Sequence, residues 1–229
     1  MFFKNKYRRK SYSQCGEDLI IKYIFDNIGI SKPSYLDIGA HHPYFLSNTF
    51  LFYETGSRGI NVEPDSTLFP IFLKKRKKDT NLNIGVGLSN SIEDFYIMSS
   101  RTLNTFSKTE AERYQNEENF PIKQIIKTKV VTIKDILNKY NGGIFPDLLN
   151  IDVEGFDEKI VRSINYLENP PKVICIETLT FSTSGNEIKN HNLINFLCSN
   201  GYFLYSDTYI NTIFVLKDIW IKRFNKETL

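Results

Sequence analysis

The stretch YLDIGAHHP, residues 35–43, decides the fold of this 229-residue chain. Apolar residues lead into Asp37, and Gly39 ends the run, which is typical of a buried strand that enters a tight turn. An acid, a glycine and two histidines at a strand end can serve a cofactor, a metal ion or only the turn itself. The residues on either side of the stretch bear on which of the three it is.

Apolar runs with short links continue the pattern in both directions. Alternation of strands with helices predicts a parallel sheet with crossover helices. Helices are expected at residues 17–29, 45–56, 67–78, 132–140, 154–167 and 190–201. Strands are expected at residues 34–39, 58–64, 81–88, 92–99, 127–132, 147–152 and 172–178, with a closing pair at 202–207 and 211–217. Residues 99–121 are polar and hard to place.

Composition limits the classes of protein that this chain can belong to. Hydrophobic residues make up 41% and charged residues 24%, which predicts an ordinary folded core. A net charge of +3 is too small to indicate nucleic-acid binding. Three cysteines without a CxxC pair fit a reducing cytoplasm, and no apolar run is long enough to span a membrane. We expect a cytoplasmic protein with a basic tail at 1–10 and one domain at 11–229.

Acidic residues end four of the predicted strands. Asp37, Glu63, Asp152 and Glu177 each follow an apolar run. Because the carboxyl ends of parallel strands meet at one edge, where ligands of such sheets bind, these acids point to a site there. A GxGxxG cradle for a diphosphate is missing after Asp37, so a nucleoside without phosphates fits better than a dinucleotide.

Four separate pieces of the sequence resemble the FkbM-type S-adenosylmethionine-dependent methyltransferases. They are SYSQCGED from Ser11, YLDIGAHHPYFLSNTFLFYETGSRGINVEP from Tyr35, LLNIDVEGFDEKIV from Leu148, and KVICIET from Lys172. The resemblance implies a Rossmann-like class I methyltransferase fold, an α/β architecture. Its sheet is seven-stranded and mostly parallel, with the last strand antiparallel and helices on both faces. It also implies that residues 99–126 are an insertion that covers the substrate.

The resemblance assigns roles to individual residues. Glu63 would bind the ribose of the cofactor, Gly39 would let its methionine part pass close to the turn, and Asp37 would hold that turn. The full set expected at the cofactor is Gln14, Asp37, Gly39, Ala40, His41, Glu63, Pro64 and Val86. Glu17 and Asp18 would cover the methionyl end with Gln14, or would only give the first turn of a helix its negative charge.

Transfer of a methyl group to a hydroxyl requires a group that takes the proton. Asp152 is the favoured base, and His42, Glu154 and Glu177 are the other residues expected in catalysis, with His41 also a candidate. Glu154 could instead cap the following helix. A divalent metal held by Asp152, Glu154, Glu177 and His42 is chemically possible, but we favour a base without a metal.

The expected reaction is O-methylation of a sugar or glycan precursor, with a small-molecule or glycan acceptor. The alternatives are a nicotinamide-dependent oxidoreductase and a non-catalytic binding module of the same fold. The basic run KKRKK at residues 74–78 ends a predicted helix, and we expect it to be solvated.

Overall fold

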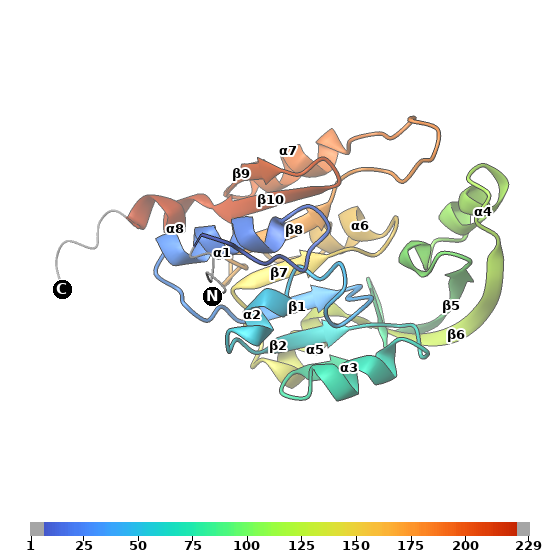
Figure 1. Ribbon diagram of the computed structural model, residues 1–229, viewed down its shortest axis with the longest axis horizontal. Coiled ribbons are helices and arrows are strands. Elements are labelled where there is room, and N and C mark those ends of the chain that lie inside the picture. Colours follow the sequence, from blue (N-terminus) through green and yellow to red (C-terminus); the bar gives the residue numbers. More distant parts are fainter. Residues whose placement is uncertain (1–6, 224–229) are drawn as a thin grey trace, which may run out of the picture.

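A twisted seven-stranded sheet forms the centre of the molecule (Figure 1). The computed structural model describes residues 7–223, so residues 1–6 of the predicted basic tail lie outside the described residues. The strand order is β3-β2-β1-β7-β8-β10-β9, and β10 is antiparallel to both of its neighbours. The strands are β1 (Tyr35–Ile38), β2 (Gly59–Val62), β3 (Thr80–Leu82), β7 (Leu148–Ile151), β8 (Val173–Glu177), β9 (Tyr202–Asp207) and β10 (Asn211–Leu216). The predicted fold class is confirmed.

Helices cover both faces of this sheet because the strands are apolar on both sides. One hydrophobic cluster joins the sheet to α1 (Glu17–Asn27), α2 (Phe50–Glu54) and α8 (Lys217–Lys222). A second cluster joins the opposite face to α5 (Ile133–Tyr140), α6 (Asp157–Arg162) and α7 (His191–Ser199). The remaining crossover helix, α3 (Phe69–Lys75), connects β2 to β3.

A second, three-stranded sheet stands at one end of the first (Figure 1). It pairs β6 (Ile122–Thr132) with β4 (Gly85–Gly87) on one side and β5 (Ser91–Met98) on the other. The single strand predicted at 81–88 is therefore wrong, because the chain leaves the large sheet after Leu82 and its continuation joins the small one. Between β5 and β6 lie a 3-10 turn, η1 (Arg101–Leu103), and α4 (Lys108–Asn116). The insertion expected at 99–126 is shorter, because residues 122–126 belong to β6, and we call residues 99–121 the insertion.

Two predicted helices start later than the sequence suggests. Residues 45–49 form a loop in which Leu46 has a φ of 53°, so α2 begins only at Phe50. Glu154 and Gly155 have φ values of 49° and 93°, which are not helical, so α6 begins at Asp157. In both places, backbone in the left-handed region separates a strand from the helix that follows it.

The basic run at residues 74–78 contains a buried residue, so the expectation of a fully solvated run is wrong. The guanidinium of Arg76 donates to Asp79 at 2.8 Å, to the Pro43 carbonyl and the Tyr35 hydroxyl at 2.9 Å, and to the Thr49 hydroxyl at 3.0 Å. Its exposed fraction is 0%. Arg76 therefore connects the loop after β1, through Pro43 and Thr49, to Tyr35 of β1. The lysines of the run are exposed.

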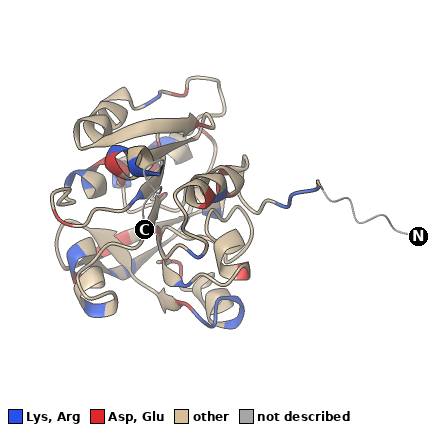
Figure 2. Cartoon of the chain, turned by 90° about the vertical axis from the view of Figure 1, so that its left-hand side faces the viewer, with Lys and Arg blue, Asp and Glu red and all other residues tan. Residues whose placement is uncertain are grey.

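Charged residues are spread over the helices rather than gathered by sign. On the face seen in Figure 2, segments with Lys or Arg stand beside segments with Asp or Glu, in keeping with a net charge of +3. Within residues 7–223, no helix combines the length and the apolar character needed to cross a bilayer.

Candidate active site

A cavity of about 430 Å³ opens at the carboxyl ends of β1, β2, β7 and β8. It brings together ten of the residues that the sequence analysis named. These are Gln14, Asp37, Gly39, Ala40, His41, Glu63, Pro64, Asp152, Glu154 and Glu177. The first and the last of them, Gln14 and Glu177, are 163 residues apart in the chain, and those that follow Gln14 meet because the parallel strands all end at this edge.

The register of the strands arranges the acids in two rows. Asp37 pairs with Asn61 on one side and with Asn150 on the other, which makes a polar row inside the sheet. Two positions further along the strands, on the same face, Glu63, Asp152 and Glu177 form the next row beside the cavity. Asp37 therefore lies one step deeper than the other three acids.

Asp37 is held by protein groups. One carboxylate oxygen accepts from the Thr49 hydroxyl at 2.6 Å, and the other accepts from the Asn150 amide at 2.9 Å. Burial raises its pKa, and these hydrogen bonds and Arg76 act in the opposite direction. Asp37 thus anchors the floor of the cavity and fixes the loop that contains Thr49.

Gly39 is required by the neighbouring strand end. Its φ is +77°, in the left-handed region, and an added Cβ would lie 1.7 Å from the carbonyl oxygen of Asp152. No side chain can occupy that space. The turn after β1 and the turn after β7 therefore pack backbone against backbone, a reason for the glycine that no local pattern reveals.

Glu63 faces the cavity with a carboxylate that the backbone holds in place. One oxygen accepts from the His41 amide and the other from the Asp65 amide, both at 2.7 Å. Each oxygen keeps a lone pair for a further donor. Burial raises the pKa of Glu63 to about 8, and the charges of Asp65 and Asp37 add to the increase.

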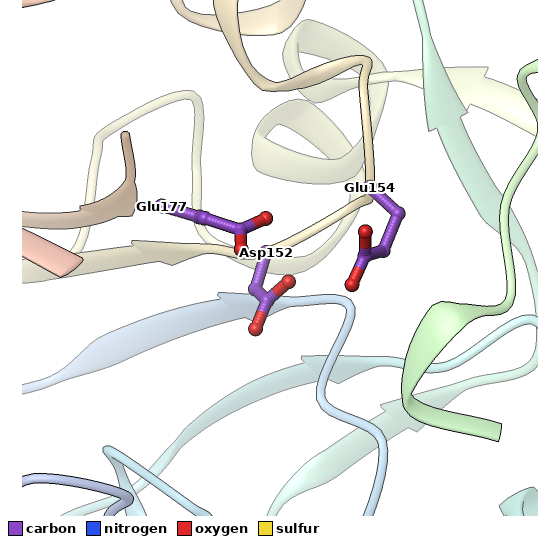
Figure 3. Close-up of side chains that lie close together, drawn as sticks. All are labelled: Asp152, Glu154 and Glu177. Carbon is purple, nitrogen blue, oxygen red and sulfur yellow. The ribbon is translucent and has the colours of Figure 1, made fainter. Parts of the chain in front are cut away.

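Asp152, Glu154 and Glu177 form an acid cluster (Figure 3). One carboxylate oxygen of each lies within 4.8 Å of the others, and two of the three residues come from the loop after β7. Solvent reaches Asp152 through the cavity, but protein surrounds it, so burial together with Asp157 and Asp37 raises its pKa to about 7. Burial and the neighbouring acids also raise the pKa values of Glu154 and Glu177.

The question whether Glu154 faces the cavity or caps the next helix is answered by its contacts. Glu154 joins the acid cluster, whereas Asp157 accepts from the backbone amide of Val153 at 3.1 Å at the start of α6. Burial raises the pKa of Asp157 to about 6. Glu154 therefore faces the cavity, whereas Asp157 stabilises the turn that leads into α6.

Two predicted site residues lie outside the cavity. His42 turns away, and its Nδ1 accepts from the Phe45 amide at 3.0 Å while its ring packs on Tyr44 at 4.5 Å. It does not reach the acid cluster as a base or a metal ligand. Val86 lies in β4 and is buried in the hydrophobic core, because the strand expected to border the cofactor has moved into the small sheet.

Glu17 and Asp18 are also structural. Glu17 accepts from the Cys15 amide and the Thr208 hydroxyl, both at 2.8 Å, and Asp18 accepts from the Tyr12 amide at 2.7 Å. Both carboxylates are fully buried. They shape the loop that carries Gln14 to the cavity and take no place in the lining themselves.

Several lining residues were missed as site residues. Four are amides, Asn48, Asn104, Asn150 and Asn211, and Asn48 donates to Asn150 at 2.9 Å. Asn150 could have been identified from the sequence, because it is the polar residue in the otherwise apolar strand LLNI. The insertion contributes Arg101, which is the only Lys or Arg among the described residues that line the cavity. Its partner, Asp65, lies 3.8 Å away.

Comparison with known proteins gives one family match. The model described as "Methyltransferase FkbM domain" matches residues 37–204. No curated protein matches the chain.

Two of the similar solved structures are methyltransferases by their descriptions. One is 1,6-didemethyltoxoflavin-N1-methyltransferase from Burkholderia thailandensis with bound 1,6-didemethyltoxoflavin and S-adenosylhomocysteine, at 9% identity and a TM-score of 0.41, covering 87% of this chain and 74% of that one. The other is a putative RNA methyltransferase from Pyrococcus horikoshii, at 11% identity and a TM-score of 0.42, covering 92% and 91%. At these TM-scores, neither structure carries a ligand or a reaction over to this chain.

The family match extends over most of the cavity. It begins at Asp37, includes both turns that meet at Gly39, and contains the whole acid cluster. The segment with Gln14 precedes it. Because the matched segment is well over half of the sequence, the chain belongs to the methyltransferase FkbM family.

Proposed function

We propose that this protein transfers the methyl group of S-adenosylmethionine to a hydroxyl group of a sugar or glycan precursor. The observation that carries the proposal is the row of acids at the carboxyl ends of three parallel strands, Glu63 after β2, Asp152 after β7 and Glu177 at the end of β8, beside one cavity, in a member of a methyltransferase family. Bound S-adenosylmethionine supplies an activated methyl on a sulfonium cation. The rest of the chemistry falls to residues of this chain.

The residues present fit that cofactor. A cavity of about 430 Å³ lies within the range of about 300–1,000 Å³ that holds ligands of this size. Glu63 keeps a lone pair on each oxygen for the two ribose hydroxyls. The lining contains several carboxylates and a single arginine, which favours a cationic sulfonium over the diphosphate of a nicotinamide cofactor.

Asp152 would act as the general base. Its pKa of about 7 lets it take a proton near neutral pH, and its carboxylate faces the cavity. Alignment of the hydroxyl with the methyl group would supply most of the rate. The aromatic rings of Phe106, Phe181 and Tyr209 line the cavity and offer flat apolar surfaces to a sugar ring.

The acid cluster also has the donor set that a divalent cation such as Mg²⁺ takes, since three carboxylates converge. His42, expected as a fourth ligand, lies elsewhere. We nevertheless propose Asp152 as a base that works without a metal, and treatment with a chelator distinguishes the two possibilities.

The test is calorimetric titration of the purified protein with S-adenosylmethionine, S-adenosylhomocysteine and NAD, followed by a mass-spectrometric screen of sugars for O-methyl products. We expect both adenosyl ligands to bind and NAD to be silent. Binding of NAD alone would contradict the proposal. Binding of the adenosyl ligands, with methyl transferred only to nitrogen acceptors, would contradict the choice of a hydroxyl.

A further inference from the structure

Two buried side chains of the insertion contact Glu154. The hydroxyl of Thr105, whose exposed fraction is 0%, donates to the backbone carbonyl of Glu154 at 2.7 Å. The hydroxyl of Tyr114, which is 2% exposed, donates to Oε2 of the same residue. The insertion therefore forms hydrogen bonds to both the backbone and the carboxylate of Glu154, one member of the acid cluster.

The backbone of Glu154 needs such support. Its φ of 49° lies in the left-handed region, which a residue with a long side chain rarely adopts unless its surroundings impose it. Gly155 follows with a φ of 93°, and an added Cβ there would lie 2.8 Å from Cγ of Glu110. The helix α4 thus packs directly on this turn, and the Thr105 hydrogen bond fixes the direction of the Glu154 carbonyl.

Thr105 is itself rigidly placed. Its backbone exchanges hydrogen bonds with Tyr96 of β5 in both directions, at 2.9 and 3.2 Å, and its hydroxyl also accepts from the Ser107 amide at 2.9 Å. The hydroxyl proton is therefore directed at Glu154. A small threonine in this position links the second sheet to the loop after β7.

Tyr114 acts on the carboxylate. Its ring is held edge-on by Phe181 at 5.8 Å, so the hydroxyl has little freedom to move. By engaging Oε2 it sets the rotation of the carboxylate, and among residues 7–223 no donor engages the other oxygen, Oε1. That oxygen stays available to the space shared with Asp152 and Glu177.

We propose that Thr105 and Tyr114 are positioning residues that hold Glu154 in the acid cluster where the methyl group is transferred. The insertion then completes the reaction site as well as forming a wall of the cavity. This inference rests on the proposed function, because the acceptor end of the site is defined by the cofactor that the function assigns.

The test uses two cofactor analogues and needs no acceptor. In sinefungin, a protonated amine replaces the S-methyl group, whereas S-adenosylhomocysteine has nothing in that place. The ratio of the two affinities therefore reports the carboxylates around the transferred methyl. We expect the wild-type protein to prefer sinefungin. Tyr114→Phe and Thr105→Val should each lower that preference about tenfold, as loss of a charge-assisted contact would, with the affinity for S-adenosylhomocysteine unchanged.

Matched variants separate positioning from general packing. Thr105→Ser keeps the hydroxyl and should keep the preference for sinefungin. Tyr202→Phe removes the hydroxyl of another fully buried tyrosine, one that donates to the Pro171 carbonyl, and should also leave the preference intact. If Tyr114→Phe fails to fold, the Thr105→Val and Thr105→Ser pair still decides the question.

The outcomes are distinct. An unchanged preference for sinefungin in both Tyr114→Phe and Thr105→Val would overturn the inference. An equal loss of affinity for sinefungin and S-adenosylhomocysteine would also overturn it, because that result indicates a structural role only. A wild-type protein that binds S-adenosylhomocysteine without preferring sinefungin would overturn the inference and leave the proposed function standing. A wild-type protein that binds neither ligand would remove the proposed function and, with it, the inference.

Discussion

Gly39 and Asp152 belong to strand ends that touch through their backbones, since the Asp152 carbonyl oxygen lies 1.7 Å from where a Cβ on Gly39 would be. The contact joins the turn after β1 to the loop after β7, which carries two residues of the acid cluster. The spacing between the turn after β1 and the loop after β7 therefore depends on the absence of a side chain at residue 39.

Gly39→Ala should be strongly destabilising. The added methyl group meets backbone, which cannot move aside as a side chain can, and the φ of +77° adds further strain. We expect a loss of more than about 2 kcal/mol in the free energy of unfolding, measured by urea denaturation. Gly142→Ala is the control, because φ is also positive there and an added Cβ meets nothing within 4 Å. Equal losses in the two variants would contradict the role of the Asp152 contact.

Glu63→Ala should weaken binding of S-adenosylhomocysteine. Glu63 is the group expected on the ribose. Above its pKa of about 8 it is ionised, and a hydrogen bond to a charged group contributes about 1.5–3 kcal/mol, or a factor of about ten or more in Kd, so the titration is made at a pH above that value. Calorimetric titration measures the change, with the exposed Glu93→Ala as the control. An unaltered Kd in Glu63→Ala would place the ribose elsewhere.

Asp152→Asn should abolish turnover while S-adenosylhomocysteine still binds. Loss of a general base lowers the rate by about 10²–10⁴. Product formation on an acceptor found by screening is the measurement, and Asp94→Asn on β5 is the control.

Treatment with a chelator tests whether Asp152 acts as a base without a metal or as a metal ligand. We expect wild-type turnover to persist in excess EDTA, because the base works alone. Loss of activity that Mg²⁺ restores would instead make the acid cluster a metal site, and turnover that survives Asp152→Asn would remove Asp152 from both tasks.

Glu63 should also make stability depend on pH. Its pKa is raised to about 8, so the folded protein keeps a proton that the unfolded chain loses from pH 4.5 upward. The free energy of unfolding should therefore fall as the pH rises through that window, by up to about 1.4 kcal/mol for each unit of pKa difference.

The variant Glu63→Gln, which cannot ionise, should show a shallower fall. Urea denaturation at pH values across the window measures the slope, and Glu93→Gln serves as the control. A slope in Glu63→Gln as steep as in the wild type would assign the pH dependence to other groups.

Arg76→Met should destabilise the fold although it lies in a run of lysines. Removal of one partner from a buried charged network costs about 3–5 kcal/mol. Lys77→Met, the exposed neighbour, should cost little. Thermal unfolding of the two variants measures the difference, and similar melting temperatures would contradict the buried network.

The sequence predicts well those features that depend on periodicity and strand order. The apolar runs that end in Glu63, Asp152 and Glu177 identify three members of one row, because parallel strands must bring their carboxyl ends together. Arg76 could not be predicted as buried, since its partners Tyr35 and Pro43 are more than 30 residues away in the chain. His42 shows the same limit, because its direction depends on how the following loop folds back.

The division of the expected strand at 81–88 has a similar cause. Thr80–Leu82 pairs with β2, whereas Gly85–Gly87 pairs with β6 of the small sheet. That partner begins more than 30 residues later. The contacts of Thr105 and Tyr114 with Glu154 could not be predicted for the same reason, although the sequence did indicate the insertion that contains both residues.

The pairing of β4 with the last residues of β6 has a consequence for how this enzyme family could diversify. Gly85–Gly87 lies directly beside Val130–Thr132, so the chain leaves and re-enters the body of the molecule at adjoining points. The segment between them, residues 88–129, can be lengthened, shortened or exchanged without interrupting a strand of the large sheet. Chimeras that swap residues 91–129 between relatives should therefore keep the large sheet and the ends of its strands intact while changing the wall of the cavity that the insertion forms.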